Sequence, residues 1–384
     1  MIGELARTPR YQGAGSSRIN PTRLDNALDE IRALASVDVA FAPGYLDDGT
    51  TNDELRAAAT DAARASEVAV VFVGVPAALE SEGFDRTDLE LPSEQTELLD
   101  AVVAANPNTV VVLSNGGVVR VSGFADRVPA IIEGWLLGQA GGGALADVLY
   151  GLVDPAGRLA ETIPVRLEDT PSYTDFPGEH GHVRYGEGLF VGYRGFDAHR
   201  TEVSFPFGHG LSYTTFSYSD AVATVGDDLV VTVTVTNTGS RSGSEVVQVY
   251  LGVPDSSVTR APRELKGFAK VRLDAGESRQ VAVPVRRADL AYWDTRVDTW
   301  VVEGGVYRVE IGASSRDIRA TCTVDIDGDE VSIPLTLESS IGEILANPAA
   351  AEVLSKIFAT ADGAAPASTR QSSRWRPRCR SNGY

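Results

Sequence analysis

The 384-residue sequence predicts an α/β fold: a mostly parallel α/β sandwich domain over residues 1–165, followed by an all-β sandwich over residues 225–320. In the first range helical and strand patterns alternate, which is typical of a parallel sheet with helices on both faces. The strand pattern at residues 68–75 is continuously apolar, as in strands that are covered on both sides. In the second range apolar residues alternate with Thr between turns rich in Gly and Pro, which indicates an antiparallel sandwich.

Each element of residues 1–165 is predicted from its local pattern. Apolar residues at helical spacing predict helices over residues 24–35, 53–66, 93–103 and 141–150. Short runs that are apolar throughout predict strands over residues 68–75, 110–113 and 130–132. A short strand is also predicted over residues 37–41. Ser93 is a predicted N-cap, because its hydroxyl can accept from a free amide of the first helical turn. The chain opens partway through the expected first strand, so that strand is predicted to be truncated.

The remaining residues fall into four predicted segments. Residues 166–224 are rich in Pro, Gly and aromatic residues and are predicted to be an ordered connector, with four buried aromatics: Phe205, Phe207, Tyr213 and Phe216. Within residues 225–320, strands are predicted over residues 229–236, 245–251 and 306–312. A carboxyl-terminal extension, residues 321–360, carries a short helix that is interrupted near Pro348. Residues 361–384 hold five arginines and few packing residues, which predicts a disordered tail.

Composition and charge restrict the class of partner. A net charge of −19 argues against nucleic acid and anionic membranes, since both require basic surfaces. No apolar stretch approaches the roughly 20 residues of a membrane span, and the start lacks a signal-peptide pattern, so a cytoplasmic location is expected. Cys322 and Cys379 are too few for a disulfide framework. His180 and His182 stand in a polar turn, and neither a metal site nor a cofactor is predicted.

The most informative motif is the acidic loop Glu-Ser-Glu-Gly-Phe-Asp-Arg at residues 80–86. It follows the predicted strand 68–75, and ligand sites in open α/β sheets collect at the carboxyl ends of strands. Three carboxylates and one arginine at such an edge indicate proton-transfer chemistry. A solvated acidic loop is the alternative that the composition leaves open.

Several motifs in this order resemble the carboxyl-terminal portion of glycoside hydrolase family 3, the family of many β-glucosidases and β-xylosidases. Residues 80–86 resemble the family's acid/base loop, and residues 229–312 resemble its fibronectin type III-like domain. The other matching segments are residues 10–17, 115–117, 157–159, 205–213 and 264–268. The resemblance implies retaining hydrolysis of O-glycosidic bonds, with a β-glucoside or oligosaccharide as substrate.

The resemblance also assigns roles to residues. Glu82 matches the family's general acid/base, with Glu80 as the runner-up. The implied substrate-binding residues are Gln12, Gly13, Gly15, Ser16, Ser17, Asp85 and Arg86. Bare amides and hydroxyls at residues 12–17 suit sugar hydroxyls, although a purely structural turn remains open. Arg86 is expected to pair with Asp85 and to stiffen the loop.

One part of the family pattern is missing from this sequence. In the family a separate (β/α)8 barrel supplies the nucleophilic aspartate in a Ser-Asp-Trp-like segment, and these 384 residues contain no such segment. A barrel domain or chain is therefore an expected partner, and the chain alone is expected to lack turnover. The alternatives are a non-catalytic carbohydrate-binding or interaction module and a decayed fragment.

Overall fold

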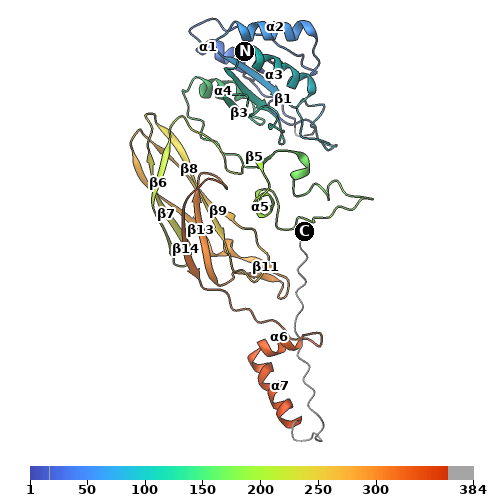
Figure 1. Cartoon of the computed structure of the whole chain (residues 1–384), viewed down its shortest axis with the longest axis vertical. Helices are drawn as coiled ribbons and strands as arrows, with labels where there is room; N and C mark the ends of the chain where they lie inside the picture. The colour runs from blue at the N-terminus through green and yellow to red at the C-terminus, as the bar shows by residue number, and fades with distance from the viewer. Residues whose placement is uncertain (17, 362–384) are drawn as a thin grey trace, which may run out of the picture. The chain divides into compact units, whose positions relative to one another are not determined.

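The computed structural model describes residues 1–16 and 18–361 (Figure 1). They form two compact units, one of residues 1–292 with 302–329, and one of residues 293–301 with those from 330 on. The first unit contains the α/β domain, the connector and the β-sandwich. The tail predicted to be disordered lies outside the described residues, apart from Ala361 at the end of the last helix.

A parallel three-stranded sheet forms the centre of the α/β domain. Its strands are β1 (Ala69–Gly74), β2 (Thr109–Ser114) and β3 (Ala130–Glu133), in that order. Ile2 extends the sheet beyond β1, because its amide donates to Val70 and its carbonyl accepts from Phe72. The predicted strands 68–75, 110–113 and 130–132 are thus confirmed to within one or two residues.

Two pairs of helices cover the two faces of this sheet. The helices are α1 (Ala27–Leu34), α2 (Asp53–Arg64), α3 (Ser93–Ala105) and α4 (Gly141–Leu149). Val71 and Leu113 pack in one core with α2 and α3, whereas Phe72 and Val112 pack in another with α1 and α4. Neighbouring residues of one strand point to opposite faces. A strand covered on both sides must therefore be apolar throughout, which explains the sequence pattern.

Two local predictions in this domain are wrong. Residues 37–41 form no strand; only Ala42 makes a ladder contact, with Ile2, and Val37 is exposed. Backbone pairing in this segment is possible only beside the first residues of the chain, where Ala42 lies next to Ile2. Ser93 is not an N-cap either, because Pro92 occupies that position and Ser93 is the first residue of α3. Its hydroxyl instead donates to the side chain of Glu94.

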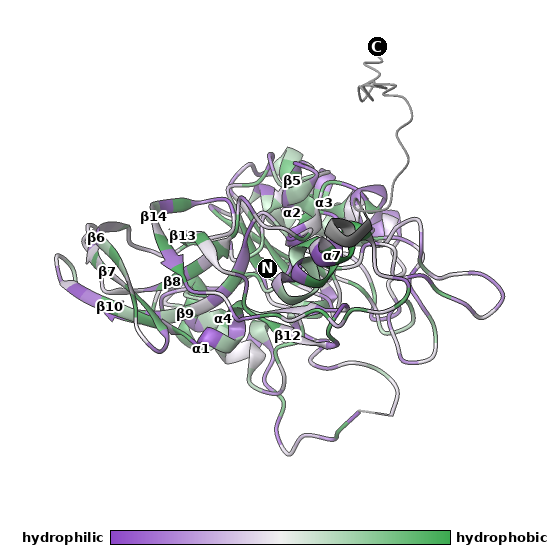
Figure 2. Ribbon diagram, turned by 90° about the horizontal axis from the view of Figure 1, so that it is seen from below, coloured by the Kyte–Doolittle hydropathy of each residue, from purple (hydrophilic) through white to green (hydrophobic). Residues whose placement is uncertain are grey.

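The β-sandwich consists of two antiparallel sheets. One sheet has the strand order β10 (Ser278–Val285), β7 (Leu229–Asn237), β6 (Phe216–Val225). The other has the order β14 (Ile318–Ile326), β13 (Gly305–Gly312), β8 (Gly243–Gly252), β9 (Glu264–Leu273). Along β7 the buried Val231, Val233 and Val235 alternate with partly buried threonines. The strands of the sandwich carry both hydrophobic and hydrophilic residues (Figure 2). The fold class predicted from the sequence is confirmed, and strands β6 and β14 extend the sandwich to both sides of residues 225–320.

The connector region contributes a two-stranded sheet that packs in the α/β core and a short helix that contacts the sandwich. Strands β4 (Ile163–Pro164) and β5 (Val203–Phe205) pair, and α5 (Tyr193–Ala198) lies between them in sequence. The ring of Phe207 stacks on Tyr193 at 4.5 Å between centroids. The connector aromatics are less buried than expected: Phe205, Phe207 and Phe216 are half-buried, and Tyr213 is 41% exposed. The hydroxyl of Tyr213 donates to the carbonyl of Val148.

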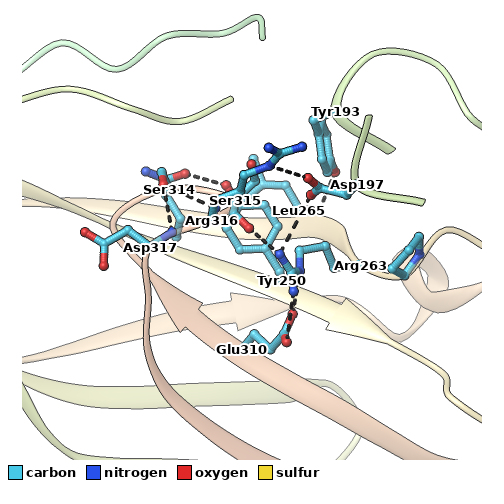
Figure 3. A network of polar contacts seen from close by, with 12 residues as sticks. Tyr193, Asp197, Tyr250, Arg263, Leu265, Glu310, Ser314, Ser315, Arg316 and Asp317 are labelled. Carbon is cyan, nitrogen blue, oxygen red and sulfur yellow. Dashed lines mark hydrogen bonds and ion pairs between the residues drawn. The ribbon is translucent and has the colours of Figure 1, made fainter. Parts of the chain in front are cut away.

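A polar network holds α5 on the sandwich (Figure 3). Asp197 accepts from Arg316 at 2.8 Å and lies 3.8 Å from Arg263. Arg263 pairs with Glu310 at 2.7 Å and also donates to the carbonyl of Ser315. The carboxylates of Asp197 and Glu310 are nearly buried, so each relies on these arginines in place of water.

The loop after α4 is joined to strand β8 of the sandwich by a buried ion pair. Arg158 Nη2 lies 2.7 Å from Glu245 Oε1, and the two side chains are 9% and 7% exposed. Nearby, Asp154 accepts from the hydroxyl of Ser212 and from the amide of Ser244. The α/β domain and the sandwich are therefore joined by a buried ion pair and by hydrogen bonds.

The second unit contains strand β12 (Thr299–Val301) and the helices α6 (Ile341–Ala346) and α7 (Pro348–Ala361). Ser340 and Glu343 form a capping box at the start of α6. The helix predicted over the extension is confirmed, including its interruption at Pro348. Within the described ranges, the structure has no helix with the length and hydropathy needed to cross a bilayer.

The remaining helices and strands are three or four residues long. Short 3-10 helices lie at Glu4–Ala6, Leu167–Asp169 and Arg287–Leu290. Strand β11 (Tyr292–Asp294) pairs with β12, and an edge-to-face contact joins Trp293 to Trp300.

Candidate active site

Three loops meet at the carboxyl edge of the parallel sheet. The acidic loop, residues 80–86, follows β1, and the Asn-Gly-Gly loop, residues 115–117, follows β2. The third loop, residues 10–16, contacts the acidic loop through hydrogen bonds to Glu80 and Glu82. Because the strands are parallel and adjacent, their carboxyl ends bring segments far apart in sequence to one edge.

Glu80 lies between these loops, and its carboxylate accepts hydrogen bonds from the two other loops. Its Oε2 accepts from Arg10 Nη1 at 2.6 Å and from the amide of Gly116 at 2.7 Å. Its Oε1 accepts from the amide of Gly117 at 2.5 Å and lies 3.7 Å from Arg86 Nη1. The carboxylate is 17% exposed and is matched by backbone amides and guanidinium groups.

These contacts determine the charge state of Glu80. Burial alone would raise the pKa of its carboxyl, but the hydrogen bonds from Gly116, Gly117 and Arg10 hold that pKa below its usual value. Both carboxylate oxygens of Glu80 are already occupied by these donors, which argues against Glu80 as the acid/base residue. The expected pairing of Arg86 with Asp85 is wrong, because Arg86 faces Glu80 and donates to the carbonyl of Val118.

Glu82 is exposed, and its carboxylate contacts the loop of residues 10–16. Its Oε2 accepts from the amide of Ser16 at 2.6 Å. Hydrogen bonding from the hydroxyl and the amide of Ser16 lowers the pKa of Glu82. Gly15 has φ +101°, and a Cβ there would lie 2.6 Å from Glu82 Oε2, so the close approach requires glycine. The structure thus brings Gly15, Ser16 and Glu82 together.

The other predicted substrate-binding residues differ in what they contact. Gln12 closes its own loop: Nε2 donates to the carbonyl of Ile19 at 2.8 Å, and Oε1 accepts from the amide of Ile19 at 2.9 Å. Its side-chain amide is therefore already occupied. Asp85 is exposed and forms no ion pair with any described residue. Ser17 lies outside the described residues.

An open cavity of about 380 Å³ adjoins these loops. It is lined in part by residues of the loop at 10–16, including Arg10, Tyr11 and Gly13, and by Ala77 and Ala78 after β1. Within the described part of the chain, no three His, Cys, Asp or Glu side chains are grouped so that they could ligate a metal. The polar groups of the site are thus carboxylates, guanidinium groups and amides.

Sequence reasoning missed Glu133, which ends β3 beside the Asn-Gly-Gly loop. Its Oε1 accepts from the amide of Trp135 at 2.9 Å, and its Oε2 lies 3.5 Å from Asn115 Nδ2. Burial, with a smaller contribution from Glu161, raises the pKa of Glu133 to about 7, although both hydrogen bonds act in the opposite direction. The available signal was a single carboxylate directly after the apolar run 130–132.

Glu133→Gln is expected to stabilise the chain at high pH only. The folded pKa lies above the unfolded one, so the unfolded chain loses its proton first and folding becomes less favourable as pH rises from about 4.5 to about 7. Glutamine removes this penalty. Between pH 5 and pH 8 its advantage should grow by about 2–3 kcal/mol.

Urea unfolding at several pH values measures this difference, with the exposed Glu67→Gln as the control. An advantage of Glu133→Gln that stays constant across the range would mean that Glu133 titrates normally.

The fold and the site define an α/β domain with a carboxylate loop at a sheet edge, joined to an antiparallel sandwich. A model of the glycosyl hydrolase family 3 C-terminal domain matches residues 1–213, and a fibronectin type III-like model matches residues 245–315. The first match covers more than half of the chain. The chain therefore belongs to glycosyl hydrolase family 3, as its motifs predicted.

Curated relatives and solved structures agree with this assignment. The chain is 47% identical over 365 residues to an exo-α-(1→6)-L-arabinopyranosidase of Bifidobacterium longum, covering 94% of this chain and 48% of the relative. It is 44% identical over 367 residues to thermostable β-glucosidase B of Acetivibrio thermocellus, covering 93% and 48%. A family 3 β-glucosidase structure from Bifidobacterium adolescentis matches with a TM-score of 0.86 and 48% identity, covering 92% of this chain and 52% of that one.

The matches cover nearly all of this chain but only part of each relative. The chain spans about half the length of the curated relatives that it matches. It corresponds to the carboxyl-terminal portion of family 3 glycosidases, which agrees with the missing barrel segment.

Proposed function

We propose that this chain carries the acid/base half of a retaining glycosidase site, with Glu82 as the general acid/base. The observation that carries the proposal is the setting of Glu82, an exposed carboxylate at the sheet edge, held by the amide of Ser16. Both carboxylate oxygens of Glu80 already accept hydrogen bonds, so Glu80 is not available for proton transfer. The nucleophile comes from a barrel domain or chain outside these 384 residues.

Retaining hydrolysis assigns Glu82 two successive tasks. It first protonates the oxygen of the leaving group while a carboxylate about 5–5.5 Å away attacks the anomeric carbon. It then accepts a proton from the water that hydrolyses the glycosyl-enzyme. In the chain by itself, Ser16 lowers the pKa of Glu82. The negative nucleophile and the exclusion of water by a barrel both act in the opposite direction and favour the protonated acid.

The substrate class follows from the relatives. One is named a β-glucosidase and another an exo-α-(1→6)-L-arabinopyranosidase, so β-glucosides and α-L-arabinopyranosides are the two substrates to compare. In both, the bond to be cleaved joins the anomeric carbon of a pyranose to an oxygen, and the protonation step is the same.

A chimera tests the proposal. The part of Acetivibrio thermocellus β-glucosidase B that this chain does not match is joined to this chain in place of the matching part, which is 44% identical. The chimera is expected to hydrolyse nitrophenyl β-glucoside or nitrophenyl α-L-arabinopyranoside, whereas the purified chain alone is expected to hydrolyse neither. Retaining catalysis needs both carboxylates, and positioning by the barrel supplies much of the reduction in barrier.

Two results would contradict the proposal. A folded chimera without turnover, while the intact relative is active, would show that this chain cannot supply the acid/base half. Turnover by the chain alone, abolished by Glu82→Ala, would mean that a nucleophile is present within these 384 residues.

A further inference from the structure

We propose that Glu80 is a positioning residue for Glu82, acting through a set of contacts that we call the Glu80 clamp: Arg10, Glu80, Arg86, Gly116 and Gly117. The inference rests on the proposed function, because it assigns Glu80 a role through the acid/base residue. Four observations carry it, namely the anchoring of Arg10, the close approach of Gly116, the short link from Glu80 to Glu82, and the scarcity of other contacts on Glu82.

Arg10 connects the clamp to the sheet. Its Nη1 donates to the carbonyl of Val75, directly after β1, and to Glu80 Oε2, while its Nη2 donates to the carbonyl of Glu80 at 3.1 Å. The arginine side chain is 8% exposed, so these bonds are shielded from water. One guanidinium thus fixes both the backbone and the side chain of Glu80 to the end of a buried strand.

The two glycines shape the other side of the clamp. A Cβ on Gly116 would lie 2.9 Å from Glu80 Oε2 and 3.0 Å from its Cδ, closer than ordinary van der Waals contact. The carboxylate therefore reaches both amides only because residue 116 has no side chain. Two amides and two guanidinium groups around one carboxylate form a charge-assisted site rather than a surface ion pair.

Glu82 itself has few contacts that would hold its backbone. Its amide makes a long hydrogen bond of 3.4 Å to the carbonyl of Ala14, and Gly83, which follows it, has φ +97°. The nearest firm anchor is Glu80, two residues before it. Without the clamp, the loop would be held only by the contacts of Glu82 with residues 14–16. A displacement of about 1 Å in a catalytic group is enough to lower a rate about 100-fold.

Two substitutions test the clamp in different ways. Glu80→Gln keeps the size of the side chain but places an NH2 group where amides and guanidinium groups donate. Gly116→Ala keeps the carboxylate and displaces it. Gly157→Ala is the matched control, because a Cβ at Gly157 meets no atom within 4 Å.

In the chimera, both clamp variants are expected to lower kcat/KM for cellobiose about 10–100-fold, the range of a misplaced proton donor. With dinitrophenyl β-glucoside the loss should be several times smaller, since a good leaving group needs little protonation. This dependence on the leaving group separates a positioning role from a general loss of folded enzyme, which would reduce both rates equally. Equal losses, or no loss, would overturn the proposal.

A second measurement uses the chain as it exists and does not depend on activity. Hydrogen exchange of amides in residues 79–86 is expected to become faster in Glu80→Gln and Gly116→Ala than in Gly157→Ala, because the loop opens more readily. Unchanged exchange would overturn the clamp even if the chimera is inactive. A wild-type chimera without turnover, together with faster exchange in both variants, would instead contradict the proposed function and leave the clamp supported.

Discussion

In the chimera, Glu82→Ala is expected to lower kcat/KM for cellobiose about 10²–10⁴-fold, the usual contribution of a general acid or base. Dinitrophenyl β-glucoside should suffer far less in the glycosylation step, because its leaving group departs without a proton. Hydrolysis of the glycosyl-enzyme then becomes slow, since no base activates water. Azide, which attacks without general-base assistance, should restore turnover and yield a glycosyl azide.

The matched control for this experiment is Glu90→Ala. Glu90 is also an exposed glutamate, and it pairs with Arg120 at 2.6 Å. Exposed pairs of this kind contribute about 0–1 kcal/mol to stability. Losses that are equal for both substrates, without rescue by azide, would remove the acid/base role from Glu82.

Glu245→Ala is expected to destabilise the chain by about 3–5 kcal/mol, because it leaves Arg158 buried without its counter-ion. The pair joins the loop after α4 to β8, and both side chains are less than 10% exposed. Water cannot readily replace the lost carboxylate. Urea unfolding, followed by tryptophan fluorescence and by circular dichroism, measures the change and reports whether the two domains unfold together.

Asp100→Ala provides the comparison for the buried pair. Asp100 pairs with Arg127 at the same distance of 2.7 Å, but their side chains are 58% and 43% exposed. Its loss should cost less than about 1 kcal/mol. Similar costs for the two substitutions would mean that Arg158 finds another partner or reaches water when Glu245 is removed.

The sequence predicted the sheet well because burial on two faces leaves a clear pattern. Val71 and Phe72 are adjacent in β1 and face different helix pairs, so neither position admits a polar residue. The same physical reason explains the failure at residues 37–41. A strand forms only where a neighbouring strand is present to pair with it, and a sequence pattern does not specify the neighbours.

The site was predictable in its location but not in its internal contacts. The position of residues 80–86 after a buried strand predicted a carboxylate site at the sheet edge, and Gly15 and Ser16 do reach Glu82. The partner of Arg86 was not predictable, because it depends on how the amides of Gly116 and Gly117 orient Glu80. Glu133 was missed for a similar reason, since its burial arises from packing around the end of β3.

The buried pair between Arg158 and Glu245 also has a consequence for synthesis on the ribosome. The partners are 87 residues apart in the chain, so the arginine leaves the ribosome well before the strand that neutralises it. At roughly 5–20 residues per second, the delay is on the order of 10 s, long compared with the collapse of a small domain. During this interval the loop after α4 cannot settle into its final environment. The loop after α4 therefore reaches its final contacts only after β8 of the sandwich has been translated.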